Sequence, residues 1–129
     1  MVTPLEIFSG FSVDDIAAAK SFYGDTLGLA ISDGPMGNLD LELPSGGHVF
    51  IYPKPDHTPA TFTILNLVVE DIDAAVDDLN SRGVATAIYD DPSLPTDGKG
   101  VLRGRAAGQG PDIAWFRDPA GNVISVLQN

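Results

Sequence analysis

The chain of 129 residues is long enough to fold into one domain with a buried core, and too short for two domains of ordinary size. It has no cysteine, which excludes disulfide bonds, thiolate nucleophiles and cysteine metal sites. Eighteen acidic and seven basic residues give a net charge of −11, which repels the phosphates of nucleic acids and anionic membrane surfaces and attracts cations, or simply keeps the protein soluble.

The first half of the chain predicts one strand, one helix and three more strands. Residues 5–13 suit a strand, and Asp14 and Asp15 then supply an N-cap for a helix that Gly28 ends. One face of this helix is apolar and carries Ile16, Ala19, Tyr23 and Leu27. Three further strands are expected over residues 29–33, 38–43 and 48–52.

The second half repeats this order of elements. A strand over residues 62–69 leads to Glu70 and Asp71, which cap a helix that Gly83 ends. Three strands are again expected, over residues 84–89, 113–117 and 122–127. A shift of 56 positions brings each half onto the other, with Val13 on Val69, Asp15 on Asp71 and Ile16 on Ile72. The pattern predicts two βαβββ modules, at about residues 1–53 and 61–129, joined by a proline-rich linker.

Three short motifs carry a resemblance to a known family. The helix starts read Val-Asp-Asp-Ile and Val-Glu-Asp-Ile, Phe22-Tyr23 precedes Leu27-Gly28-Leu29, and the last hairpin is Phe-Arg-Asp-Pro-Ala-Gly-Asn. With the repeat, they resemble the vicinal oxygen chelate superfamily, which includes glyoxalase I, bleomycin resistance proteins and extradiol dioxygenases. The resemblance implies a single α+β domain over residues 1–129, in which two mixed sheets curve around a shared cavity with the helices outside, and frequently a homodimer.

The resemblance also implies where a metal ion would bind. The positions that hold metal ligands in metal-dependent members of the superfamily correspond to Phe8, Phe50, Ile64 and Ser125 in this chain. Two aromatic rings and an aliphatic chain offer no lone pair, and a lone hydroxyl is a weak ligand. We therefore expect no metal and no cofactor, which argues against metal-dependent glyoxalase, dioxygenase or epimerase activity.

Strand alternation separates the residues that face the cavity from those that face the helices. It places Leu65 and Leu67 under the second helix, and the residues that alternate with them, such as Ile64 and Asn66, toward the cavity. Trp115 and Phe116 point to opposite faces, so only one of them can be inside. The resulting candidate ligand-binding set is apolar and aromatic with sparse polar points: Phe8, His48, Phe50, Tyr52, Ile64, Asn66, Arg105, Trp115 and Ser125. These residues line an organic-ligand pocket or fill a small closed core.

Two histidines could take part in chemistry. His48 shares a strand face with Phe50 and Tyr52, so His48 and Tyr52 are candidates for proton transfer if the protein is an enzyme, and otherwise for orienting a ligand. His57 lies in the proline-rich linker and is expected to be an exposed loop residue. No Gly-x-Ser-x-Gly motif is present, and the sequence indicates no base partner for Ser125.

A glycine-rich segment over residues 90–111 carries three of the seven basic residues, Lys99, Arg103 and Arg105. Long loops of this kind can close over a site, where such cations would bind a carboxylate or a phosphate. The other interpretation is a hairpin whose cations pair with Asp90, Asp91 or Asp97.

The leading hypothesis is a metal-independent protein of the bleomycin resistance type that sequesters a small aromatic or cationic molecule. The alternatives are a glyoxalase- or isomerase-type enzyme, and a scaffold with a closed core. With no apolar run of eighteen residues and no signal-peptide pattern, we expect a cytoplasmic protein. We expect a small organic ligand and a second copy of the chain as partners, and neither nucleic acid nor membrane.

Overall fold

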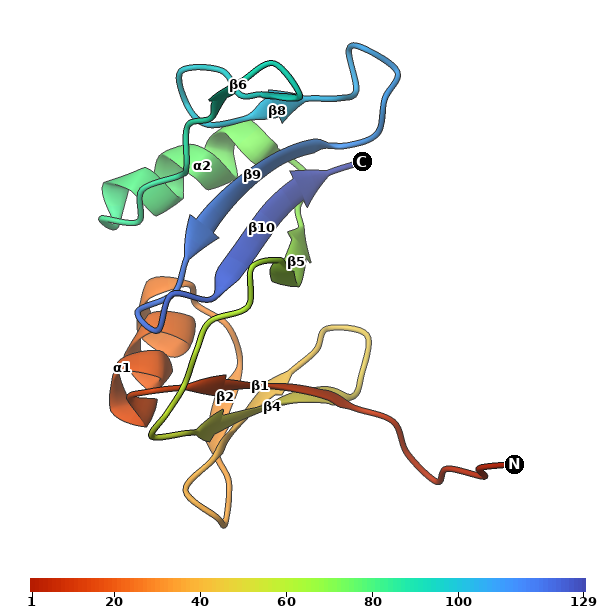
Figure 1. Ribbon diagram of the computed structural model, residues 1–129, viewed down its shortest axis with the longest axis vertical. Coiled ribbons are helices and arrows are strands. Elements are labelled where there is room, and N and C mark those ends of the chain that lie inside the picture. The colour runs from red at the N-terminus through yellow and green to blue at the C-terminus, as the bar shows by residue number, and fades with distance from the viewer. The chain divides into compact units, whose positions relative to one another are not determined.

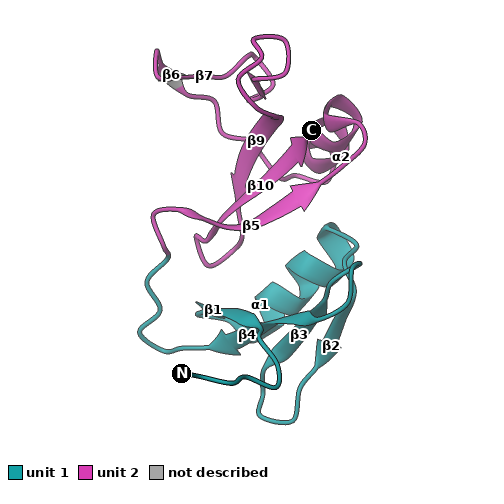
Figure 2. Ribbon diagram, turned by 90° about the vertical axis from the view of Figure 1, so that its right-hand side faces the viewer, with its two compact units in different colours: residues 1–59 teal, residues 60–129 magenta. Residues whose placement is uncertain are grey.

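A computed structural model describes residues 1–129, with the exception of the side chain of Asp90. The chain forms two compact units, residues 1–59 and 60–129, each with its own sheet (Figure 2). Each unit combines one mixed sheet with helical structure, so the predicted α+β class and the two-module repeat are confirmed. No helix in the described part of the chain is long and apolar enough to cross a membrane.

The first unit contains a four-stranded sheet in the order β1-β4-β3-β2 (Figure 2). Its elements are β1 (Ser9–Val13), α1 (Ile16–Lys20), the π-helical turn η1 (Ser21–Thr26), β2 (Ile31–Asp33), β3 (Leu39–Glu42) and β4 (His48–Pro53). Strand β1 runs parallel to β4, and the other neighbours are antiparallel. The predicted single helix is thus an α-helical turn that continues as η1.

The second unit repeats this topology, with the strand order β5-β10-β9-β8 and β5 parallel to β10. Its elements are β5 (Thr63–Val68), α2 (Ile72–Ser81), β6 (Asp90–Asp91), β7 (Leu94–Pro95), β8 (Leu102–Arg103), β9 (Asp112–Arg117) and β10 (Val123–Gln128). Strands β6 and β7 form a small separate hairpin. Each unit therefore brings its first long strand beside its last one.

The two helix starts are nearly identical in geometry. The Asp15 carboxylate accepts a hydrogen bond from the backbone N–H of Ala18 at 3.1 Å, and Asp71 accepts one from Ala74 at the same distance. Both caps have extended backbones, with φ of −131° and −136°. Each satisfies one of the amides that a helix start leaves without a partner inside the helix. The predicted caps and the shift of 56 positions are confirmed.

Alternation along the strands builds a separate core in each unit. In β4, Val49 and Ile51 are buried, whereas His48, Phe50 and Tyr52, which alternate with them, are half-buried on the other face. The first core also holds Phe11, Val13, Ala19, Tyr23, Leu39 and Leu41. In the second unit α2 covers one face of the sheet (Figure 1), and the buried apolar residues are Ile72, Val76, Leu79, Val84, Val101, Ala114, Phe116, Ile124 and Val126.

Two predicted strands differ from the structure. Strand β1 begins at Ser9 rather than at residue 5, and Leu5 and Ile7 are exposed. Residues 84–89 form no strand, although the Ala87 amide donates a hydrogen bond to the Trp115 carbonyl at 2.8 Å. A single hydrogen bond does not form a β-ladder, so β-propensity alone wrongly predicts a strand in this segment. Of the two interpretations of the segment 90–111, the structure supports the hairpin, because β6 pairs with β7 and a third strand, β8, follows.

Candidate functional site

Four rings lie together on the face of the first sheet that is opposite its helices. Phe8 stacks on His48 with ring centroids 4.7 Å apart, and Phe50 stacks on Tyr52 with centroids 5.6 Å apart. The Phe8 and Phe50 rings meet edge to face at 6.3 Å and join the two pairs. We call these four residues the aromatic strip. Phe8 keeps 52% of its surface exposed, so the strip is not closed off as a core.

The parity of β4 and a glycine in β1 explain the strip. His48, Phe50 and Tyr52 alternate with the buried residues of β4, as predicted, and no bulge interrupts them. Gly10 lies opposite Phe50 in the parallel register. A Cβ atom at Gly10 would lie 3.0 Å from the Phe50 carbonyl oxygen and 3.7 Å from the Phe50 ring. The glycine therefore leaves room for the Phe50 carbonyl, and without a side chain it leaves the Phe50 ring uncovered on the β1 side.

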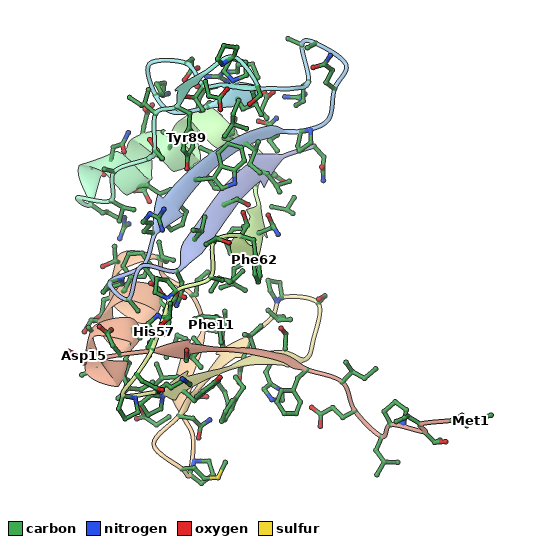
Figure 3. All side chains as sticks on the ribbon, in the orientation of Figure 1. Met1, Phe11, Asp15, His57, Phe62 and Tyr89 are labelled. Atoms are coloured by element: carbon green, nitrogen blue, oxygen red, sulfur yellow. The ribbon has the colours of Figure 1, made fainter. Side chains whose placement is uncertain are left out.

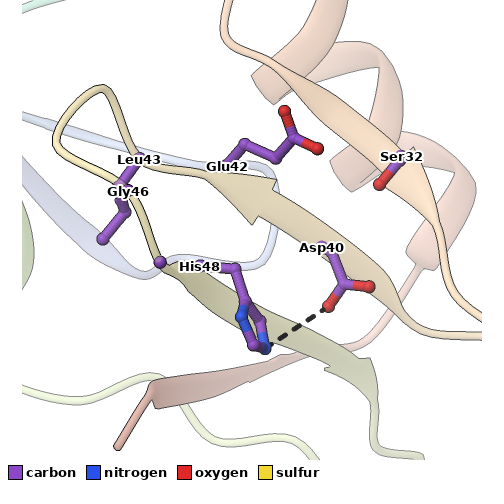
Figure 4. A pocket seen from close by; sticks show the side chains of 7 residues that line it. Ser32, Asp40, Glu42, Leu43, Gly46 and His48 are labelled. Atoms are coloured by element: carbon purple, nitrogen blue, oxygen red, sulfur yellow. Dashed lines mark ion pairs between the residues drawn. The ribbon is translucent and has the colours of Figure 1, made fainter. Parts of the chain in front are cut away.

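Carboxylates surround the His48 end of the strip. The His48 Nδ1 atom lies 3.5 Å from the Glu6 carboxylate, and Nε2 lies 3.9 Å from that of Asp40 (Figure 4). Beside them is an open pocket of about 480 Å³, lined by Ser32, Asp40, Glu42, Leu43, Gly46, Gly47 and His48. This end of the strip is thus acidic and has room beside it.

A serine–histidine pair lies at the Tyr52 end. Ser12 is opposite Tyr52 in the register of β1 and β4, and its Oγ atom is 2.6 Å from Nδ1 of His57. Figure 3 shows His57 close to β1. His57 lies in a loop as predicted, but the prediction that it is exposed is wrong, because the residue is half-buried and contacts β1. Nothing in the sequence signals this contact, since 45 positions separate the two residues.

The second sheet carries a smaller polar group on the corresponding face. The Ser125 hydroxyl donates a hydrogen bond to the Asn66 side-chain oxygen at 2.6 Å, and Trp115 lies opposite Ser125 in the register of β9 and β10. Trp115 therefore shares the Ser125 face, whereas Phe116 is 2% exposed beneath α2. Ile64 falls at the register shift of β5. The predicted residues thus form two groups, one in each unit.

The cations of the segment 90–111 are held in ion pairs. Arg103 forms a bidentate pair with Asp73 of α2, at 3.0 and 2.8 Å, and a further bond to Asp97. Lys99 reaches Asp73 and Asp77 at 3.0 and 2.9 Å. Hydrogen bonds from Arg103 and Lys99 hold the pKa of Asp73 well below its usual range. The pairing with Asp97 was predicted, whereas the pairing with the helix was not.

Arg105 belongs to neither polar group. Its guanidinium lies 3.7 Å from the Asp112 carboxylate, which is largely buried at the start of β9. Asp112 and Trp115 are on opposite faces of β9, because side chains alternate along a strand. The structure therefore places Arg105 away from the Trp115 face. Asp90, another predicted partner of these cations, has its side chain outside the described part of the chain.

A family model for the glyoxalase/bleomycin resistance protein/dioxygenase superfamily matches residues 8–126. The chain belongs to this superfamily. The predicted resemblance is thereby confirmed over nearly the whole chain. A search of curated proteins finds no match.

Solved structures of this superfamily cover the chain from end to end. The antibiotic binding protein TnmS3 from Streptomyces sp. CB03234 is 28% identical, with a TM-score of 0.62 and 98% of each chain covered. A glyoxalase/bleomycin resistance protein from the same organism is also 28% identical, with a TM-score of 0.60 and coverage of 94% of this chain and 97% of that chain. A member from Sphaerobacter thermophilus DSM 20745 has 22% identity, a TM-score of 0.67 and coverage of 97% and 98%, which supports the fold alone.

The metal positions of the superfamily do not fit a divalent ion here. Phe8 and Phe50 pack ring against ring, and the Ser125 hydroxyl is engaged by Asn66. Among the side chains that the structure describes, no three histidine, aspartate or glutamate residues are grouped as metal ligands. Three of the four positions therefore have side chains without a donor atom, and the fourth offers only a hydroxyl that already forms a hydrogen bond, so the set does not suit a divalent cation.

Proposed function

We propose that this protein binds a small organic molecule with an aromatic surface and sequesters it without using a metal ion. The aromatic strip carries the proposal. Four rings on one face of a sheet, half-buried and next to an open pocket, are suited to stacking on a planar ligand. A cationic ligand is favoured further by the net charge of −11 and by the carboxylates at the His48 end.

A relative supports the same function. TnmS3, which aligns with the chain over 98% of both lengths, is described as an antibiotic binding protein. We infer that the ligand here is also an antibiotic, an aromatic natural product, and that its sequestration by this protein confers resistance. Expression in a sensitive bacterial host would then raise the inhibitory concentration of that compound, and the Phe50→Ala variant would not.

Direct binding tests the proposal with a defined probe. We expect the fluorescence of 9-aminoacridine, a planar cation, to be quenched when the compound stacks on the aromatic strip of the EDTA-treated protein. Phe50→Ala removes the central ring and should weaken binding about tenfold, given the usual worth of an aromatic contact and its buried area. Mass spectrometry of the recovered probe should show the compound unchanged.

The matched control is Ile88→Ala, which removes an exposed apolar side chain in the second unit. Phe50→Leu keeps the apolar volume and separates loss of stacking from loss of folding. Equal affinities for the wild type and all three variants would contradict a site on the strip. An altered mass of the probe would instead favour an enzyme.

A second candidate function rests on the environment of His48. The His48 imidazole lies between Glu6 and Asp40, two positions before the Phe50–Tyr52 stack begins. It could transfer protons in a lyase- or isomerase-type reaction. Tyr52 would be its partner on the same face. Turnover of a bound compound that is abolished in His48→Ala and retained after EDTA treatment is the result that would favour this enzyme.

We further propose that the protein works as a cytoplasmic homodimer. The resemblance to the superfamily implies frequent pairing, and the 13.5 kDa chain exposes an apolar N-terminal segment that includes Val2, Leu5 and Ile7. Sedimentation equilibrium should give twice the mass of the chain, and a monomer at micromolar concentration would contradict the pairing. Fractionation of the host cell tests the location.

A further inference from the structure

We infer that the aromatic strip has a direction: it binds an elongated aromatic ligand with a cationic group at the His48 end and a neutral hydrogen-bonding group at the Tyr52 end. This inference rests on the proposed function and specifies the chemical class of its ligand. Three observations on the first unit carry it. They are the acidic end, the uncharged polar end, and the length of the ring surface between them.

The His48 end is acidic from more than one element. Glu6 precedes β1, whereas Asp40 and Glu42 come from β3, and the pocket beside His48 is lined by the two β3 carboxylates. No lysine or arginine forms an ion pair with these carboxylates in the described part of the chain. An ammonium or guanidinium group placed in this pocket would gain a countercharge and a stacked ring beside it.

The polar side chains at the Tyr52 end are a serine and a histidine rather than carboxylates. The Ser12 hydroxyl and the His57 imidazole form a pair at 2.6 Å, directly across the register from Tyr52. Beside Tyr52 and His57 in the chain, Lys54 and Asp56 offset each other in an ion pair of 2.7 Å, and Asp15, which follows Ser12, is engaged as the cap of α1. A carbonyl or hydroxyl group suits this end better than a charged group does.

The distance between the two ends sets the size of the ligand. His48 and Tyr52 are four residues apart on β4, which is about 13 Å at the rise of a strand. Phe50 fills the interval, and Gly10 opposite it has no side chain to cover its ring. Two linked rings fit this interval, so the ligand class is a biaryl or fused polycyclic compound with a polar group at each end.

Three matched biphenyls test the direction of the site. The probes are 4-(aminomethyl)biphenyl, 4′-(aminomethyl)biphenyl-4-ol and biphenyl-4-carboxylate, titrated by NMR at pH 8, where histidine side chains are ordinarily neutral. We expect the phenolic amine to bind about threefold to tenfold more tightly than the plain amine, and the carboxylate to bind most weakly. Asp40→Asn should weaken both amines about fivefold and leave the carboxylate unchanged or stronger. Ser12→Ala should remove only the advantage of the hydroxyl group.

The control variant is Asp25→Asn, which removes the same charge from an exposed position in η1. This element packs on the other face of the sheet. Asp25→Asn should therefore change neither the preference for the amines over the carboxylate nor the preference for the hydroxylated amine over the plain one. Equal affinities for the amine and the carboxylate, or equal effects of Asp40→Asn and Asp25→Asn, would overturn the direction while the proposed function stands. Absence of binding by all three biphenyls would contradict both.

Discussion

At the scale of single residues, Asp118 supplies most of the side-chain hydrogen bonds in the turn between β9 and β10. Its carboxylate accepts from the amides of Ala120 and Asn122 at 2.9 and 2.8 Å, and from the Asn122 side chain at 3.0 Å. Asp118 is 5% exposed, so water cannot readily replace these bonds. Gly121 completes the turn with a φ of 85°, a conformation that glycine adopts without strain.

Asp118→Ala should lower the free energy of unfolding of the second unit by about 1–3 kcal/mol, because buried donors lose their acceptor. The single tryptophan, Trp115, lies in β9 and reports this unit by fluorescence during denaturation with urea. Asp25→Ala, at an exposed position, is the control and should change stability by no more than about 0.5 kcal/mol. Equal losses in the two variants would show that the turn does not depend on the Asp118 carboxylate.

At the scale of elements, residues 97–103 form a strap that ion pairs hold against α2. Arg103 and Lys99 both bind Asp73. Hydrogen bonds to Asp77 and Asp73 raise the pKa of Lys99, and hydrogen bonds to Asp73 and Asp97 raise that of Arg103. The pKa of Asp73 is lower in the folded protein than in the unfolded chain. The stabilisation by Asp73 is therefore complete above about pH 4 and is lost as the pH falls below it.

Asp73→Asn should lower the urea midpoint of the Trp115 signal at pH 7, and the difference from the wild type should shrink between pH 4 and pH 3. The side chains are about half exposed, so added salt should also reduce the difference. Glu70→Gln, an exposed carboxylate outside the strap, is the control. A difference that persists unchanged at pH 3 would mean that charge pairing is not what Asp73 contributes.

Elements that depend on neighbouring residues could be predicted from the sequence, and contacts between distant residues could not. Asp15 and Asp71 are recognisable as caps because each bonds an amide three positions ahead. Alternation likewise placed Phe50 and Ile51 on opposite faces. The contacts of His57 with Ser12 and of Arg103 with Asp73 span 45 and 30 positions and follow no periodicity. The Ser12–His57 pair at the Tyr52 end and the strap on α2 were therefore found only in the structure.

At the scale of the whole molecule, the net charge of −11 acts on any ligand in addition to local contacts. The acidic residues of both units contribute to this field, whereas Asp40 acts on the His48 end alone. Salt separates the two effects, since charges more than about 10 Å apart are largely screened at 0.1 M ionic strength. A close pair that is partly shielded from water is screened much less.

Raising the ionic strength from 0.03 to 0.3 M should weaken binding of 4-(aminomethyl)biphenyl about threefold to tenfold and should not weaken binding of biphenyl-4-carboxylate. Asp40→Asn removes one charge of the eighteen acidic residues, so this variant should start from a lower affinity and keep nearly the same salt dependence. NMR titrations at four salt concentrations give both quantities. If the variant lost the salt dependence entirely, Asp40 alone would account for the attraction, and the field of the whole molecule would contribute nothing to binding.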